Sequence, residues 1–280
     1  MISVVQLGIV DYATGLALQQ QLVALRKEEK IGDVLLLLEH KPVITLGRNA
    51  NAANVVASPE LLRQRGVELF ECDRGGDVTF HGPGQIVGYP IFNLRGFFRE
   101  AAPGSARQTL GVVEFVRRLE DVLIRTCADF SIPTQRLTGL TGVWTNPDRA
   151  DQAPEKTGAS AAEHQNREAK IAAIGVHISR SVTSHGFALN VNTDLSNFNL
   201  IIPCGIASKP VTSMQIELGG ELDVNAVAES IFRNVGVVFQ SQILWVETTL
   251  DALLGRTVGV PMKLPAELRQ LHKEDDTAWA

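Results

Sequence analysis

Cys204 and Lys170 have the side-chain types of a nucleophile and of its proton-transfer partner. Cys204 stands in the block Ile-Ile-Pro-Cys-Gly-Ile, after an apolar run and before a glycine, where a strand end can present a side chain. Lys170 opens the apolar run 170–179. A lysine beside a cysteine can lower the thiol pKa and pass a proton to a leaving group, as acyl transfer requires. The alternative is that neither residue takes part in chemistry, since most cysteines are small buried hydrophobes and most lysines are solvated charges.

A second candidate site is the stretch Cys-Asp-Arg-Gly-Gly-Asp-Val-Thr-Phe-His-Gly-Pro-Gly-Gln at 72–85. Its glycines leave room for a ligand or another backbone and expose amides that can bind a carbonyl or an anion. Their spacing matches neither the Walker loop nor the Rossmann fingerprint. The alternative is a tight connection between strands, with a structurally bonded His81. Arg74 and His81 favour a binding loop. The segment 42–48, with Pro42, Thr45, Gly47 and Arg48, is either a second wall of the pocket or a strand followed by a solvated arginine.

The remaining cysteines and histidines give weaker signals. Cys127 continues the apolar stripe of a predicted helix and is expected to be buried, whereas Cys72 cannot be separated from Cys204 by sequence alone. His177 and His185 lack a third ligand at metal-binding spacing, so we expect no metal site. Three cysteines without paired spacing favour a reducing compartment.

The elements that must position these residues alternate between short apolar runs and amphipathic helices, which indicates an α/β fold. Val112, Val116, Leu119 and Leu123 share one face of the longest predicted helix. The expected order is a strand at the N-terminus, a helix capped by Asp11, a strand pair at 33–40 and 42–47, a helix at 58–66, a strand at 85–94, a helix at 105–130, a hairpin at 170–192 joined through 179–184, a strand at 198–205 and a helix capped by Asp223.

Two segments are expected to stand apart from this core. Residues 146–168 contain no valine, isoleucine, leucine or aromatic residue, so they cannot bury enough apolar area to offset the entropy of ordering them. We predict a mobile polar insertion there and a surface tail at 256–280. Residues 1–255 are then a single catalytic domain.

Composition excludes several classes of function. The net charge of −5, without a block of lysines or arginines, predicts no basic surface that could bind nucleic acid. The aromatic content of 6% is too low to predict a surface on which bases could stack. No secretory signal is visible, and no apolar run approaches the roughly 18 residues of a membrane helix. We therefore expect a cytoplasmic protein that binds neither nucleic acid nor membrane.

Several blocks taken together resemble the lipoyl(octanoyl) transferases, the octanoyl-[acyl-carrier-protein]:protein N-octanoyltransferase family. The resemblance runs from about residue 35 to residue 219, and its most specific part is RGGDVTFHGPGQIVGYPI at 74–91. The other blocks follow in the family's order: GLTGVW, KIAAIGVHI, SHGFALNVN, FNLIIPCGI and VTSM. The long polar insertion and the tail depart from the common pattern without removing a motif residue.

The resemblance implies a fold, a reaction and a set of site residues. The fold is a mixed sheet flanked by helices, like the catalytic domains of biotin protein ligases and lipoate ligases. Cys204 corresponds to the nucleophile that carries the octanoyl chain as a thioester, and Lys170 to its activating partner. The substrate pocket is implied to consist of Arg74, Gly75, Gly76, Asp77, Val78, Thr79, Phe80, His81, Tyr89, Ala173, Ile174, Gly175, Gly186, Phe187 and Ala188.

The implied reaction is the first step of endogenous protein lipoylation. The donor is octanoyl-acyl carrier protein, with its acyl group on phosphopantetheine, and the acceptors are lipoyl domains of 2-oxoacid dehydrogenases and the glycine cleavage H protein. No ATP, metal or other cofactor is expected. Two alternatives stay open: an ATP-dependent lipoate or biotin ligase on the same fold, and an acyl-binding protein without catalysis.

Overall fold

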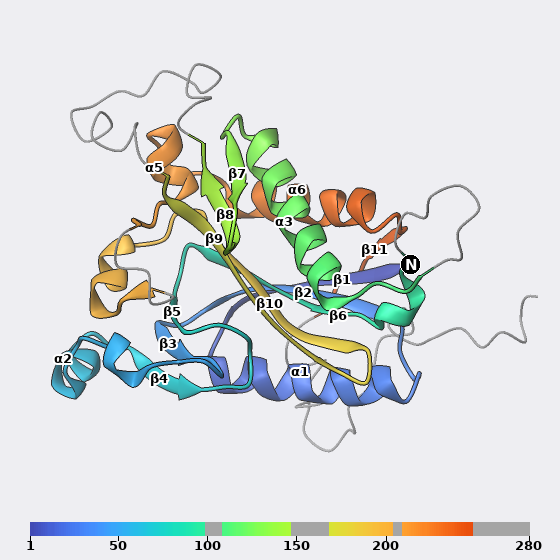
Figure 1. Ribbon diagram of the computed structural model, residues 1–280, viewed down its shortest axis with the longest axis horizontal. Helices are drawn as coiled ribbons and strands as arrows, with labels where there is room; N and C mark the ends of the chain where they lie inside the picture. Colours follow the sequence, from blue (N-terminus) through green and yellow to red (C-terminus); the bar gives the residue numbers. More distant parts are fainter. Residues whose placement is uncertain (99–107, 147–167, 204–208, 249–280) are drawn as a thin grey trace, which may run out of the picture.

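The computed structural model describes residues 1–98, 108–146, 168–203 and 209–248. Within these ranges, eight strands form a mixed sheet in the order β11-β1-β2-β6-β10-β9-β8-β7 (Figure 1). The strands β1 and β2 are parallel, as are β1 and β11, and the other neighbours are antiparallel. The strands are β1 (Ile2–Val10), β2 (Asp33–His40), β6 (Gln85–Ile91), β7 (Thr134–Leu137), β8 (Leu140–Thr145), β9 (Lys170–Ser179), β10 (Val182–Asn190) and β11 (Ile243–Trp245).

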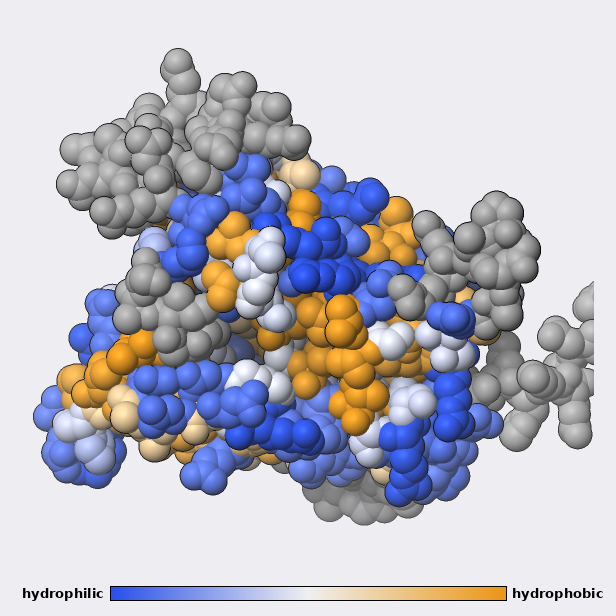
Figure 2. All heavy atoms as spheres, viewed as in Figure 1, coloured by the Kyte–Doolittle hydropathy of each residue, from blue (hydrophilic) through white to orange (hydrophobic). Residues whose placement is uncertain are grey.

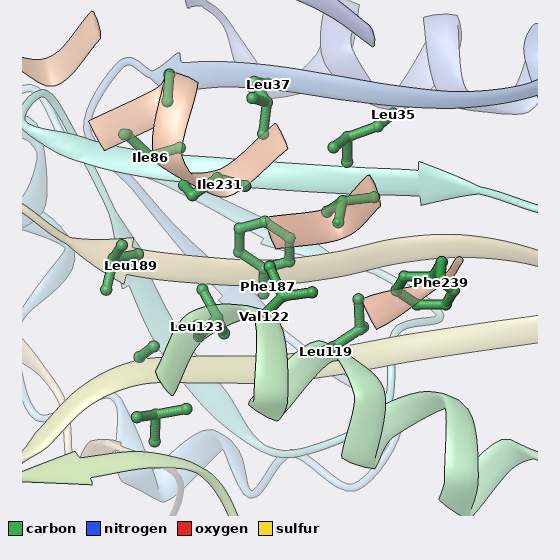
Figure 3. Close-up of a cluster of buried hydrophobic side chains, with 14 of the residues drawn as sticks. Leu35, Leu37, Ile86, Leu119, Val122, Leu123, Phe187, Leu189, Ile231 and Phe239 are labelled. Carbon is green, nitrogen blue, oxygen red and sulfur yellow. The ribbon is translucent and has the colours of Figure 1, made fainter. Parts of the chain in front are cut away.

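Helices cover both faces of this sheet, with α1 (Tyr12–Lys27) on one face and α3 (Val112–Asp129) and α6 (Val224–Val238) on the other (Figure 1). The run of leucines in β2 supplies both cores, because successive side chains of a strand point to opposite faces. Leu35 and Leu37 pack with α3 and α6, as Figure 3 shows, whereas Leu36 packs with α1. This explains why 33–40 is apolar without alternation.

A second, smaller sheet in the order β4-β3-β5 lies beside the first. It contains β3 (Val43–Leu46), β4 (Glu68–Glu71) and β5 (Val78–His81), and α2 (Pro59–Gln64) precedes β4. The predicted pairing of 33–40 with 42–47 is therefore wrong. Since β1 and β6 occupy both edges of β2, no edge is left for β3, and the chain turns at 41–42 into the other sheet.

Most predicted helix starts are confirmed by their caps. Asp11 accepts a hydrogen bond from the Thr14 amide at 2.9 Å, and Asp223 accepts one from the Asn225 amide at 2.9 Å. Such caps satisfy amides that have no partner within the helix. The predicted hairpin is also confirmed, but its turn is shorter than expected.

That turn consists of Arg180 and Ser181 alone, both with positive φ (50° and 67°), as a two-residue hairpin turn requires. The predicted strand at 198–205 is wrong where the structure describes it. Residues Leu195–Leu200 form a 3-10 helix, and Ile201 makes one isolated bridge to Val55. The short helices Ala52–Asn54, Leu94–Gly96 and Met214–Leu218 complete the elements.

All of the predicted insertion at 146–168 except its two end residues, and the whole predicted tail at 256–280, lie outside the described residues, so these predictions remain predictions. None of the helices in the described ranges is both long and apolar enough to cross a membrane. Figure 2 shows a mostly polar face with an apolar area near its centre, where Figure 1 places α3 and the β9–β10 hairpin. Val112 and Val113, at the start of α3, are exposed.

Candidate active site

A cavity of about 290 Å³ lies on the α1 face of the large sheet, under the segment 74–77. This volume is at the lower end of small-molecule sites, which span roughly 300–1,000 Å³. The cavity brings together fourteen of the residues singled out in the sequence: Arg74, Gly75, Gly76, Asp77, Thr79, His81, Tyr89, Lys170, Ala173, Ile174, Gly175, Gly186, Phe187 and Ala188. Small residues at 173, 175, 186 and 188 line the side of the cavity formed by β9 and β10, which we call the trench.

Val78 and Phe80 do not line this cavity, contrary to the expectation. They belong to β5, whose alternate residues Thr79 and His81 face the cavity. Val78 and Phe80 therefore point the other way, into an apolar cluster between the small sheet and the 3-10 helix at 195–200, where Phe80 meets Phe198. Their role is packing.

Lys170 begins β9 at one side of the cavity, and its residue is only 8% exposed. Its Nζ lies 5.2 Å from the ring centroid of Trp144, and Lys209 Nζ lies 5.8 Å from the same ring. Such a cation over an aromatic face is held electrostatically. Gly142 (φ +121°) leaves space for the β9 backbone and for the lysine, because a Cβ there would lie 2.6 Å from Ala172 O and 2.7 Å from Lys170 Cε.

Cys204, the predicted nucleophile, lies outside the described residues. The chain on either side of it is held by the pocket region: the Ile202 amide donates to Asn54 O at 2.7 Å, and the Lys170 amide donates to Pro210 O at 2.9 Å. Cys127 is fully buried as predicted, and burial raises the pKa of its thiol to about 12. It has the environment of a core residue.

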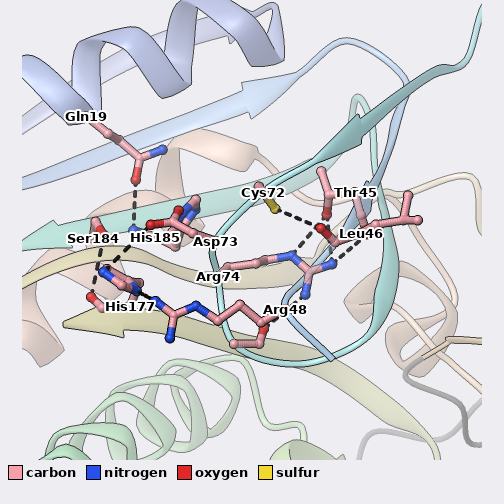
Figure 4. Close-up of polar contacts among 11 residues, drawn as sticks. Gln19, Thr45, Leu46, Arg48, Cys72, Asp73, Arg74, His177, Ser184 and His185 are labelled. Carbon is pink, nitrogen blue, oxygen red and sulfur yellow. Dashed lines mark hydrogen bonds and ion pairs between the residues drawn. The ribbon is translucent and has the colours of Figure 1, made fainter. Parts of the chain in front are cut away.

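Arg74 fastens the glycine-rich segment to the small sheet (Figure 4). Its guanidinium donates to Thr45 Oγ1 at 3.0 and 2.9 Å, to Thr45 O at 2.6 Å and to Asp77 O at 2.6 Å. The residue is 8% exposed, and its donors reach several acceptors within the chain. Thr45 was expected in a second pocket wall, but it is buried and holds Arg74 instead.

The glycines mainly allow backbone to meet backbone. Gly75 N–H donates to Val176 O at 3.1 Å, and a Cβ on Gly175 would lie 2.6 Å from Gly75 O. A Cβ on Gly47 would lie 2.4 Å from Gly76 O. Of the two possibilities given by the sequence, a ligand or another backbone, these contacts show the second. Gly76, with φ +90°, borders the cavity, as do Gly75 and Gly175.

Buried rings stand beside the cavity on the α1 side. His40 Nδ1 donates to Val10 O at 2.9 Å, and His40 Nε2 therefore accepts from the Tyr89 hydroxyl at 2.6 Å. Burial lowers the pKa of His40 to about 4 and, together with the charges of His40 and Arg74, that of His81 to about 3. Burial also raises the pKa values of Tyr12 and Tyr89. This side of the cavity is thus uncharged at neutral pH.

His185 closes the side next to α1 and was not predicted as a site residue (Figure 4). It has a positive φ of 53° within β10, its Nε2 lies 2.7 Å from Asp73 Oδ1, and its amide donates to Gln19 Oε1 at 2.8 Å. Burial lowers the pKa of His185, although the Asp73 carboxylate opposes this. Burial would raise the pKa of Asp73, but the hydrogen bond and charge of His185 lower it. Arg48, expected in the second wall, is exposed and donates to His177 instead.

The other lining residues that sequence reasoning missed are Tyr12, Asn49, Val87, Gly139, Leu140 and Thr141. Gly139, Leu140 and Thr141 belong to the block GLTGVW, so the resemblance could have pointed to them. Tyr12 gave none, since a tyrosine at a helix start has no distinctive spacing. Within the described ranges no group of three metal-binding side chains occurs. The trench can hold an uncharged chain whose polar end lies near one lysine.

Comparison with known proteins gives consistent results. The sequence matches the lipoyl protein ligase A/B catalytic domain over residues 11–236. It is 56% identical over 275 residues to an octanoyltransferase of Koribacter versatilis (strain Ellin345), with 98% of each chain covered. It is 53% identical over 255 residues to an octanoyltransferase of Acidobacterium capsulatum, with 90% of this chain and 96% of that protein covered.

Among solved structures, the fold is similar to that of a bipartite lipoate protein ligase from Thermoplasma acidophilum, with a TM-score of 0.59 at 13% identity and 91% of each chain covered. It is also similar to a lipoate-protein ligase A bound with ATP, with a TM-score of 0.57 at 11% identity, covering 91% of this chain and 94% of that one. At such low identity these likenesses show the fold alone.

Proposed function

The chain belongs to the lipoyl protein ligase A/B catalytic-domain family and is an acyltransferase, and we propose that it moves an octanoyl group from acyl carrier protein to a lipoyl-domain lysine through a thioester on Cys204. The observation that carries this proposal is the cavity beside Lys170, whose α1 side is formed by the uncharged rings of Tyr12, His81 and Tyr89. An eight-carbon chain is apolar and needs such a trench, and its reacting carbonyl needs a nearby group that transfers protons.

In the first half-reaction the Cys204 thiolate attacks the carbonyl carbon of the donor thioester. The bond from that carbon to the phosphopantetheine sulfur breaks, and the Lys170 ammonium gives a proton to the departing thiolate. One thioester replaces another. The products are octanoyl-Cys204, a free carrier thiol and a neutral Lys170 amine, which is ready to act as a base.

In the second half-reaction the neutral amine of the acceptor lysine attacks the Cys204 thioester. Lys170 takes a proton from that nitrogen as the amide forms, and Cys204 leaves as a thiolate. The enzyme returns to its starting protonation state. Since a thioester is converted to an amide, the step is downhill and requires no ATP.

The developing oxyanion requires hydrogen-bond donors, and removing one such donor typically costs about 3 kcal/mol of transition-state stabilisation. The backbone amides of Gly75 and Gly76 and those beside Cys204 are the candidates. The Gly75 amide already donates to Val176 O, which leaves the Gly76 amide and those beside Cys204 as candidates. Gly76 borders the cavity.

The proposed partners are octanoyl-acyl carrier protein as donor and lipoyl domains of 2-oxoacid dehydrogenases and the glycine cleavage H protein as acceptors. The octanoyltransferase names of the similar proteins and the lipoate ligase fold support acceptors of this class. We propose that neither ATP nor a metal takes part, because both half-reactions start from a thioester, in which the acyl group is already activated.

The test is to incubate the purified protein with octanoyl-acyl carrier protein without ATP and to measure its intact mass. We expect one octanoyl adduct on the wild type, none on Cys204→Ala, and discharge of the wild-type adduct by a lipoyl domain. Lys170→Ala should form the adduct much more slowly. Cys127→Ala is the matched control, since a thiol buried in the core should not affect the adduct.

An absent adduct, with acylation of a lipoyl domain only when ATP and free octanoate are supplied, would contradict the proposal and identify a ligase. Octanoate binding without transfer to any lipoyl domain would identify an acyl-binding protein.

A further inference from the structure

Two buried amide side chains, Gln85 and Asn190, connect the glycine-rich wall of the cavity to the opposite wall. Gln85 is 2% exposed and Asn190 is 5% exposed. His81 Nδ1 lies 2.7 Å from Gln85 Oε1, Gln85 Nε2 donates to Asn190 Oδ1 at 2.8 Å, and Asn190 Nδ2 donates to Thr212 O at 2.9 Å. None of these bonds is part of a strand ladder.

Backbone carbonyls can only accept hydrogen bonds, so they determine which atom donates in each bond of this series. Gln85 Nε2 also donates to Phe80 O at 3.2 Å, so the nitrogen must be on that side, and Gln85 Oε1 must accept from His81. Asn190 is oriented in the same way by Thr212 O. His81 therefore carries its proton on Nδ1, and its Nε2 is directed to the Thr45 hydroxyl at 3.5 Å.

The chain of bonds ends on the backbone of Lys170. The Thr212 amide donates to Lys170 O at 2.9 Å, and the Lys170 amide donates to Pro210 O at 2.9 Å. Both backbone groups of Lys170, its amide and its carbonyl, are thus bonded to the segment 210–212, and Asn190 holds that segment from the sheet. Thr212 has no solvent exposure, so water cannot replace the bond from Asn190.

We propose that Gln85 and Asn190 are positioning residues for Lys170: they hold the 210–212 segment, and with it the start of β9, so that the lysine amine is placed for proton transfer. This inference rests on the proposed role of Lys170. Neither amide lines the cavity. Their effect on the reaction must therefore pass through the backbone that carries the lysine.

Positioning of this kind affects the rate more than substrate binding, because a displacement of about 1 Å can cost on the order of 100-fold in rate. Asn190→Ala removes the donor to Thr212 O and should lower kcat about tenfold to 100-fold, with KM for octanoyl-acyl carrier protein unchanged. Asn190→Asp is close to isosteric but places an oxygen opposite Thr212 O. Asn190→Asp should show the same loss of kcat, and it tests the proposal if Asn190→Ala does not fold.

Asn192→Ala is the matched control. Asn192 is two residues further along, and it exchanges hydrogen bonds with Leu222 at 2.8 and 3.0 Å, away from Lys170. We expect it to lower thermal stability without changing kcat more than about twofold, as for a purely structural amide.

The decisive readout is a double-mutant cycle of single-turnover acyl transfer. If Asn190 acts through Lys170, then Asn190→Ala should cost nothing further in the Lys170→Ala background. Equal losses in both backgrounds, or a change in KM alone, would overturn the positioning role while leaving the proposed function intact. A wild-type rate for Lys170→Ala would instead refute the proposed role of Lys170, and the inference with it.

Discussion

Replacing His40 by glutamine is expected to make folding less sensitive to acid. His40 is fully buried, and burial lowers its pKa from the usual 6.5 to about 4. The neutral form is therefore the folded form. Below pH 6.5 the unfolded chain binds a proton at this position that the folded chain does not, so stability is complete above pH 6.5 and is lost as the pH falls towards 4.

The magnitude follows from these two pKa values. A difference from 6.5 to about 4 corresponds to about 3 kcal/mol over the whole range, at roughly 1.4 kcal/mol per pH unit. Between about pH 7 and pH 5 the expected loss from His40 is about 2 kcal/mol. His81 adds a loss of the same sign, since burial lowers its pKa to about 3.

Glutamine is the suitable replacement because it has one donor for Val10 O and one acceptor for the Tyr89 hydroxyl, the two partners of His40. Urea unfolding of wild type and His40→Gln, at several values between about pH 7 and pH 5, gives the free energy of unfolding of each protein. Over that range, the free energy of unfolding should fall by about 2 kcal/mol more in the wild type than in His40→Gln. Parallel curves, whatever their offset at neutral pH, would refute the argument that His40 is held neutral by burial.

Three further predictions concern the trench and the small sheet. Phe80→Ala should lower the free energy of unfolding by roughly 3–5 kcal/mol in urea titrations while octanoyl transfer at low temperature is retained, because the ring packs away from the cavity; a large rise in KM at full stability would contradict this. Ala188→Leu should fill the trench and shift the preferred acyl donor to chains shorter than octanoyl, measured as the ratio of kcat/KM values, whereas an unchanged ratio would show that the chain lies elsewhere. Gly142→Ala should shift the start of β9 together with the Lys170 side chain and lower kcat at least tenfold, since the new Cβ would lie 2.6 Å from Ala172 O and 2.7 Å from Lys170 Cε, and a normal kcat would show that the lysine need not stay there.

The sequence alone predicted part of the local structure, but the strands β5, β7, β8 and β11 were not expected, and α3 begins at Val112 rather than at 105. Caps at Asp11 and Asp223 and the hairpin beginning at Lys170 depend on neighbouring residues, and the structure confirms them. The partners of β3 could not be predicted in this way. Its pairing with β4 and β5 depends on which edges of β2 are already occupied, and that is decided by chain segments tens of residues away.

The candidate site divides in the same manner. Residue types in the sequence pointed to Lys170 and to the glycine-rich segment, because reactive groups and glycines are visible one by one, and the resemblance implied the small residues of β9 and β10. The tertiary structure decided which of them share a cavity. In the folded chain, Val78 and Phe80 pack in the core, and His185 lines the cavity. Arg74 binds the glycine-rich loop to the small sheet.

What the sequence determined by itself about this protein is its inventory of groups: which thiols, amines and glycines are available, and the local propensities that favour each helix and strand. What only the tertiary structure decided is direction and distance. A side chain faces the trench or the core according to strand register, and Gln85 and Asn190 became connected to Lys170 only when three distant segments packed together. Register and packing arise from contacts between segments far apart in the chain, which no local pattern records.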